Sequence, residues 1–235
     1  MKQIAFTMAE VLITIGIIGV VAAMTLPSLI SRHQKAELET ALKKNYSVMQ
    51  QALLKLQAEN AGVPPSPKLY AAQEFKDIYM KQFKVLIDCG YGSTDVTDKE
   101  NAAEFCLTEQ LNDSNQRYTD HYKTFNKKFQ IDNTYLNNGQ FVLMDGSIIF
   151  IENWDPGILY ISVDVNGIKK APNIWGHDLF TFQLMDDGRL APMGMQGTHY
   201  SEDAYCSKTS NNRYNGIACT NKALNDKKYW DILQR

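Results

Sequence analysis

The chemistry suggested by the first part of the chain is ion pairing in lipid, because an acidic residue interrupts its most apolar segment. Residues 5–23 read AFTMAEVLITIGIIGVVAA, and after Glu10 no charged residue follows until Arg32. A carboxylate inside hydrocarbon costs about 3 kcal/mol on insertion scales, and pairing with a cation removes much of that cost. The sequence therefore raises the question of which positive group could pair with Glu10. The alternative is that its side chain reaches the lipid headgroups.

Four cysteines could form disulfide bonds in the rest of the chain. They lie 17 positions apart in the first pair and 13 in the second, with a gap of 100 between the pairs: Cys89, Cys106, Cys206 and Cys219. An even number of cysteines after an apolar leader is typical of a domain outside the cytoplasm. Short loops lose less entropy on closure, which favours Cys89–Cys106 and Cys206–Cys219 among the three possible connectivities. The spacing does not match that of a zinc site.

Oxygen-bearing side chains follow a predicted strand and could bind a hard cation. Asp164, Asn166 and Asp178 lie in one loop, and Gly167 follows Asn166 as a glycine does in calcium loops. The rest of that loop pattern is missing, including its terminal glutamate. Turns in which these side chains accept backbone hydrogen bonds are the favoured interpretation, and calcium binding is the alternative. We expect no other metal or cofactor.

The sequence does not favour an enzyme or a nucleic-acid-binding protein. It has no Gly-x-Ser-x-Gly, no His-Glu-x-x-His and no phosphate-binding loop. Its four histidines lack the spacing of metal ligands: His33, His121, His177 and His199. The 24 Lys and Arg residues are interspersed with 26 Asp and Glu, for a net charge of −2. Such a balanced surface does not indicate nucleic acid as a partner.

One long helix is predicted for the first sixty residues. The twenty uncharged residues 11–30 would span about 30 Å, the thickness of one hydrocarbon core. After them, apolar residues recur at steps of three and four, as in a helix that packs on a core: Leu38, Leu42, Tyr46, Met49, Leu53 and Leu56. Pro27 should bend or locally interrupt the helix, because it lacks an N–H. Residues 60–62, with Pro64 and Pro65 after them, should end it.

Strand patterns follow in the second half of the chain. Two apolar runs, 140–144 and 147–151, flank Asp145-Gly146 and predict a hairpin. Further strands are expected at 158–165 and 179–184, with a short one after the turn at 186–188. Because no helical stretch separates them, the sheet should be antiparallel, with one face on the apolar stripe of the helix. The predicted fold class is α+β: a long N-terminal helix packed on a small antiparallel sheet.

Two regions lack a clear period. Residues 63–138 are mixed, and we expect a variable connection between the helix and a sheet at 139–191. Residues 192–235 are rich in Gly, Ser and Asn, and we expect a long loop that buries little apolar surface. A Cys206–Cys219 bond would close the most polar part of this loop.

The first thirty residues resemble the leader of type IV pilins and type II secretion pseudopilins. The resemblance rests on residues 2–12, KQIAFTMAEVL, and on Pro27. In that family a short basic leader ends in a small residue, usually Gly. Phe and Thr follow this residue, and a Glu lies four places beyond the Phe. Here Ala5 replaces the glycine. The resemblance implies cleavage between Ala5 and Phe6 on the cytoplasmic side, methylation of the new amine, and pairing of Glu10 with the Phe6 amine of a neighbouring subunit.

The function implied by this resemblance is that of a structural subunit, a minor pilin or pseudopilin of a type IV pilus or type II secretion-like filament. It would comprise a leader (1–5), a transmembrane and filament-core helix (6–30), an amphipathic helix (31–62) and an extracytoplasmic domain. It would cross the inner membrane once before it enters the filament. Its implied partners are prepilin peptidase, copies of itself or other pilin-like subunits, the inner-membrane assembly machinery and membrane lipid.

Two alternatives remain open at this point. The segment Val21-Ala22-Ala23 would suit cleavage of a secretory signal peptide, which would leave a chain that begins at Met24. The protein could also be a membrane-tethered binding module that is indifferent to Glu10.

Overall fold

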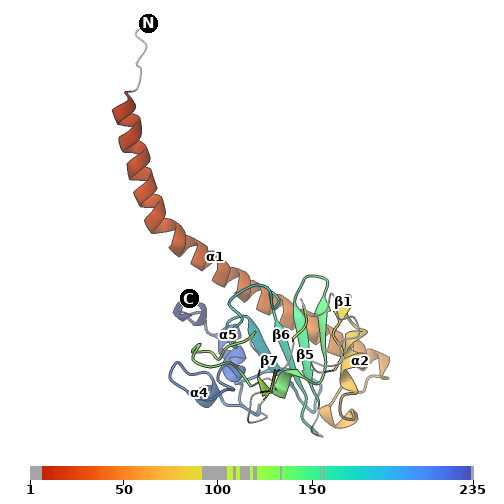
Figure 1. Ribbon diagram of the computed structural model, residues 1–235. Helices are drawn as coiled ribbons and strands as arrows, with labels where there is room; N and C mark the ends of the chain where they lie inside the picture. The colour runs from red at the N-terminus through yellow and green to blue at the C-terminus, as the bar shows by residue number, and fades with distance from the viewer. Residues whose placement is uncertain are drawn as a thin grey trace.

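The apolar leader and the amphipathic stripe form one continuous helix, α1 (Met8–Glu59), in the computed structural model of the chain. The structure describes residues 7–91, 105–107, 110–111, 117–118, 121–132, 134–153, 155 and 157–233. The first half of α1 extends away from the domain, and its second half lies along the sheet (Figure 1). Asn60 caps the helix, and Ala61 and Gly62 have positive φ angles of 50° and 85°, which ends it where the sequence predicted.

The two halves of α1 have different environments. The side chains of residues 7–30 are exposed apart from Ala22, and the length and composition of this half would let it cross a membrane. The second half buries Leu42, Asn45, Met49, Ala52, Leu53 and Leu56. Leu38 and Tyr46 pack at the edge of the same core. The predicted apolar stripe is therefore confirmed.

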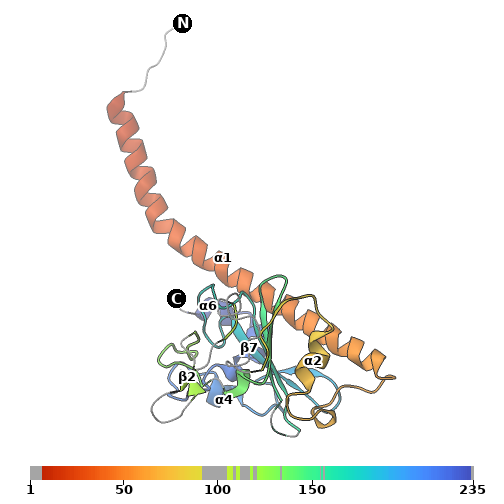
Figure 2. The same cartoon turned by 45° about the vertical axis from the view of Figure 1, so that its right-hand side comes forward.

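Pro27 lies within α1 and does not interrupt it. The helix is continuous across this residue, and its ribbon curves in both views (Figures 1 and 2). Proline removes one backbone hydrogen bond and crowds the preceding turn, which favours bending. Of the two effects that the sequence predicted, bending is the one compatible with this structure.

Six antiparallel strands form the sheet, in the order β1-β4-β5-β6-β7-β8. They are β1 (Val85–Asp88), β4 (Gln140–Leu143), β5 (Ile148–Glu152), β6 (Tyr160–Asp164), β7 (Leu179–Leu184) and β8 (Leu190–Pro192). The Asp-Gly hairpin joins β4 to β5, with Gly146 at φ 87°, a conformation that favours glycine. The antiparallel pairing confirms the predicted fold class. Strand β1 is an addition, because it comes from the expected connection and pairs with β4.

Short elements complete the fold. Before and between the strands lie η1 (Pro67–Leu69), α2 (Phe75–Met80), β2 (Gln110–Leu111), β3 (Arg117–Tyr118) and η2 (Thr134–Leu136). After the sheet come α4 (Glu202–Tyr205), η3 (Ile217–Cys219), α5 (Thr220–Asn225) and α6 (Tyr229–Ile232). Strands β2 and β3 pair with each other in a separate two-stranded sheet.

The six-stranded sheet is buried on both faces. On one face, Phe141, Ile161 and Phe182 share a core with α1, and Tyr46 stacks on Phe182 with ring centroids 5.1 Å apart. On the other face, alternate residues such as Phe150 pack with a second core around Trp175. Successive side chains of a strand point to opposite faces, so the central strands read as continuous apolar runs. We call these two clusters the helix-side core and the outer core.

The C-terminal region is not the loop that the sequence predicted. It folds into four short helical elements, and it buries Ile217, Tyr229 and Trp230. The prediction relied on the many Gly, Ser and Asn residues, several of which lie between the helical elements. However, the aromatic residues near the end reach the helix-side core, where Trp230 contacts Phe180 with ring centroids 5.9 Å apart. Large aromatic area therefore offsets the cost of ordering this polar segment.

Two disulfide bonds hold segments of the domain together. They join Cys89 to Cys106 and Cys206 to Cys219, with Cα atoms 5.8 and 4.9 Å apart. These are the pairings that the short loop lengths favoured. The first fastens the chain that follows β1, and the second closes the segment between α4 and η3.

Candidate functional site

The first turn of α1 holds Glu10 in a capping box with Thr7. The Glu10 carboxylate accepts hydrogen bonds from the Thr7 backbone N–H at 2.9 Å and from the Thr7 hydroxyl at 2.8 Å. In return, the Glu10 N–H donates to Thr7 Oγ1 at 3.3 Å. Such reciprocal bonds satisfy backbone donors that the first helical turn leaves without partners. In hydrocarbon, where water cannot replace them, these bonds matter more than at a protein surface.

The geometry of this cap also allows the Glu10 carboxylate to accept another hydrogen bond. Among the described residues, both hydrogen bonds to the carboxylate end on Oε2. The other oxygen, Oε1, can accept from a further donor without breaking the cap. The residues predicted for processing, Ala5 and Phe6, lie outside the described residues. Thr7 directly follows Phe6 in the sequence, so the cap begins at the residue after the predicted new N-terminus.

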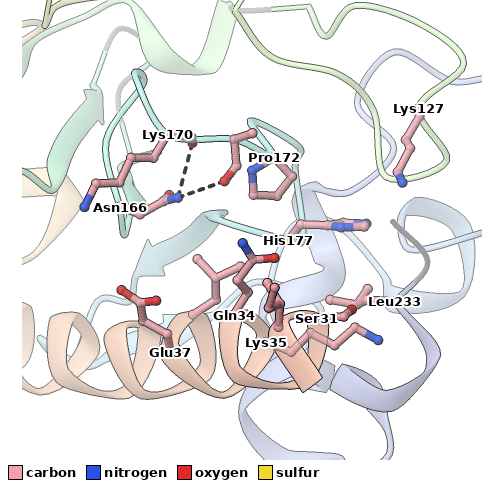
Figure 3. A pocket seen from close by; sticks show the side chains of 13 residues that line it. Ser31, Gln34, Lys35, Glu37, Lys127, Asn166, Lys170, Pro172, His177 and Leu233 are labelled. Atoms are coloured by element: carbon pink, nitrogen blue, oxygen red, sulfur yellow. Dashed lines mark hydrogen bonds between the residues drawn. The ribbon is translucent and has the colours of Figure 1, made fainter. Parts of the chain in front are cut away.

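A groove of about 680 Å³ opens between α1 and the domain, where α1 leaves its apolar segment. Its floor on α1 runs from Ile30 to Leu38, and its walls come from the turn 166–172, Lys127 and Leu233. Figure 3 shows the His177 ring between Lys127 on one side and Lys35 on the other. The sequence did not predict this groove, because its residues come from segments far apart in the chain. Only the cations just after the apolar run pointed to the region.

His177 stays neutral in the groove. Its side chain is 6% exposed, and its ring packs against Phe125 with centroids 5.4 Å apart. Burial lowers the pKa of His177 from 6.5 to about 4, and the charges of Lys127 and Lys35 act in the same direction. Both lysine charges therefore reach the same point of the groove.

This pKa shift predicts that His177 makes the fold sensitive to acid. Between pH 6.5 and 4 the unfolded chain binds a proton that the folded protein does not, so the free energy of unfolding falls as pH falls. His177→Gln lacks this titration. Between pH 7 and pH 5 its free energy of unfolding should therefore fall by roughly 2 kcal/mol less than that of wild type. Denaturant unfolding of both proteins at the two pH values measures this difference. Equal changes in the free energy of unfolding of the two proteins between pH 7 and pH 5 would contradict this prediction.

Two buried carboxylates have the opposite effect on the pH dependence of the free energy of unfolding, so wild type alone would not reveal the contribution of His177. Burial raises the pKa of Asp164 to about 6 and raises the pKa of Asp178 well above its usual range, with a further rise from the Asp164 charge. Their contribution to stability is lost as pH rises through these values. It is the same in wild type and in His177→Gln, so it cancels in the difference.

The two carboxylates considered for calcium have structural partners, whereas Asn166 Oδ1 is buried without a hydrogen-bond partner among the described residues. Asp164 accepts from the N–H groups of Asn166 and Gly167 at 3.1 and 2.8 Å and from the Tyr122 hydroxyl at 2.5 Å. Asp178 accepts from the N–H groups of Asn173 and Ile174 at 2.6 and 2.7 Å. Within the described part of the chain, no three His, Cys, Asp or Glu residues are grouped to hold a metal ion. The favoured interpretation as turns agrees with these bonds, and calcium binding stays a sequence prediction.

No protein-family model, curated protein or solved structure matches the chain.

Proposed function

We propose that this protein is a structural subunit of a type IV pilus or type II secretion-like filament, a minor pilin or pseudopilin. The observation that carries the proposal is the exposed apolar half of α1, with an acid held at its first turn. An apolar surface of this size needs lipid or other helices to cover it. Lipid can cover this surface before assembly, and a bundle of like helices can cover it afterwards.

The role of Glu10 follows from the capped first turn. After cleavage at Ala5–Phe6, each subunit would carry a new amine on Phe6, next to the cap. Oε1 of Glu10, which accepts no hydrogen bond from the described residues, could accept from the amine of a neighbouring subunit while Oε2 keeps its bonds to Thr7. A charge pair in hydrocarbon fixes the axial register of helices that otherwise pack through interchangeable apolar side chains.

The proposed location and partners are those that the resemblance of the leader implies. The chain would cross the inner membrane once, with the domain outside the cytoplasm, where its two disulfide bonds can form. Prepilin peptidase would cleave it on the cytoplasmic side. The assembly machinery would then transfer helix 6–30 from lipid into a filament of like subunits. Pro27 would bend the helix near its outer end.

The experiment that tests this function is analysis of the mature N-terminus. We expect protein extracted from membranes to begin at Phe6 with a methylated amine, because Ala5-Phe6 lies in the combined leader pattern. Intact-mass measurement identifies both changes. Ala5→Leu should block cleavage, since a small residue is needed there, whereas Ala9→Leu makes the same change outside the cut site and should be processed. A mature terminus at Met24 would restore the secretory-signal interpretation.

A further inference from the structure

The groove beside His177 lies at the depth of lipid headgroups if α1 spans a bilayer. Residues 11–30 cover about 30 Å of helix, so Ile30 marks the outer end of the hydrocarbon core. Ile30 is also the first residue of α1 that lines the groove. The groove therefore opens where the apolar half of α1 would emerge from the membrane. This step rests on the membrane insertion in the proposed function.

The lining of the groove is apolar and cationic together. Ile30, Leu38 and Leu233 supply apolar surface, and Lys35, Lys127 and Lys170 bring three positive charges. Glu37 is the one acidic residue among the groove's described lining. Beside burial, the charges of Lys127 and Lys35 lower the pKa of His177, and burial followed by the charge of Lys123 lowers the pKa of Lys127. The positive potential is thus concentrated at the His177 end of the groove.

Hydrogen bonds fix the segments that carry the cations. Lys127 has a positive φ of 64°, and its N–H donates to the Thr124 carbonyl at 2.7 Å. The same turn is tied to the C-terminal region, because Asn126 Nδ2 donates to the Ser210 carbonyl at 2.5 Å. On the α1 side, Lys35 Nζ donates to the Asp231 carbonyl at 3.4 Å. These bonds fix the backbone that carries Lys127 and hold the Lys35 ammonium group beside Asp231, and both residues line the groove.

We propose that the His177 end of this groove binds the phosphate of an anionic phospholipid from the outer leaflet. Lys35 and Lys127 would contact the phosphate, and Ile30, which lies nearer the hydrocarbon core, would contact the glycerol and the first methylenes. Ammonium groups bind phosphate as point charges, and an apolar floor favours an amphipathic ligand over a free ion. A bound lipid would fix how the domain sits on the membrane before assembly.

The test measures lipid binding by the full-length protein in detergent micelles, by native mass spectrometry. Phosphatidylglycerol should bind more tightly than phosphatidylcholine, and added salt should weaken only the former. Each basic residue near an anionic surface contributes about fivefold. We therefore expect Lys35→Gln with Lys127→Gln to weaken phosphatidylglycerol binding by roughly twentyfold. The matched control, Lys55→Gln with Lys208→Gln, removes the same charge from exposed sites outside the groove and should bind as wild type does.

Several outcomes would overturn the proposal. One is equal binding of the two lipids by wild type, which needs no variant to interpret. Another is full phosphatidylglycerol binding by the folded Lys35/Lys127 variant, with its melting temperature as the check on folding. Inorganic phosphate is titrated alone, and binding as tight as that of the lipid would assign the site to a free ion. These measurements require neither cleavage nor filaments, so their failure is distinguishable from failure of the proposed function.

Discussion

Replacing Glu10 with glutamine is expected to reduce incorporation into filaments by at least about tenfold, and Glu10→Ala should be as severe. Removing one partner of an ion pair in a low-dielectric environment leaves the other charge unpaired, at a cost of roughly 3–5 kcal/mol. The folded domain should keep its stability, because Glu10 lies in the half of α1 that makes no contact with either core. Filament yield in sheared cell fractions and the melting temperature of the purified subunit measure the two effects separately.

The choice of variants separates charge pairing from helix capping. Glutamine keeps an amide oxygen that can accept from Thr7, as Glu10 does, but it carries no charge. Thr7→Ala has the opposite effect, since it removes the hydroxyl and leaves the carboxylate. If pairing with a neighbour's amine matters, Glu10→Gln fails and Thr7→Ala assembles with a smaller loss. If capping alone matters, Glu10→Gln assembles normally, and Glu10 has no part in register. Glu39→Gln is the control for loss of an acid elsewhere on α1.

The parts of the fold that could be predicted are those with a regular period. The stripe from Leu38 to Leu56 repeats at helical spacing, and its residues do pack on the sheet. The Asp-Gly turn between two apolar runs marks the β4–β5 hairpin, since few residues other than glycine adopt the φ of Gly146. The disulfide pairing followed from loop length alone. In each case one local interaction decides the structure.

The parts that could not be predicted depend on contacts between distant segments. Strand β1 has only four residues, and it is a strand because β4 offers an open edge. Tyr229 and Trp230 look like isolated aromatics in a polar tail, yet α1 and β7 supply the surface that buries them. The groove is the clearest case, because Lys35 and Lys127 are 92 positions apart. No local pattern places them on opposite sides of His177.

Opening the C-terminal disulfide should produce the largest loss of domain stability among the changes considered. We expect Cys206→Ala with Cys219→Ala to lower the free energy of unfolding by about 3 kcal/mol, the chain-entropy value for a loop of this length. For a domain of this size, the melting temperature should fall by roughly 6–12 °C. Tryptophan fluorescence during denaturant unfolding reports the change, since Trp175 lies in the outer core and Trp230 in the helix-side core.

The competing explanation is that hydrogen bonds alone order this segment. Asn215 is fully buried, and its side chain both accepts from the Ser207 N–H at 3.0 Å and donates to the Ser207 carbonyl at 2.8 Å. The Gly216 N–H also donates to the Tyr205 carbonyl at 2.7 Å. If these bonds suffice, the cysteine variant loses less than about 1 kcal/mol, and Asn215→Ala loses more. If the disulfide dominates by restricting the unfolded chain, the order is reversed, and the cysteine variant loses more than Asn215→Ala does.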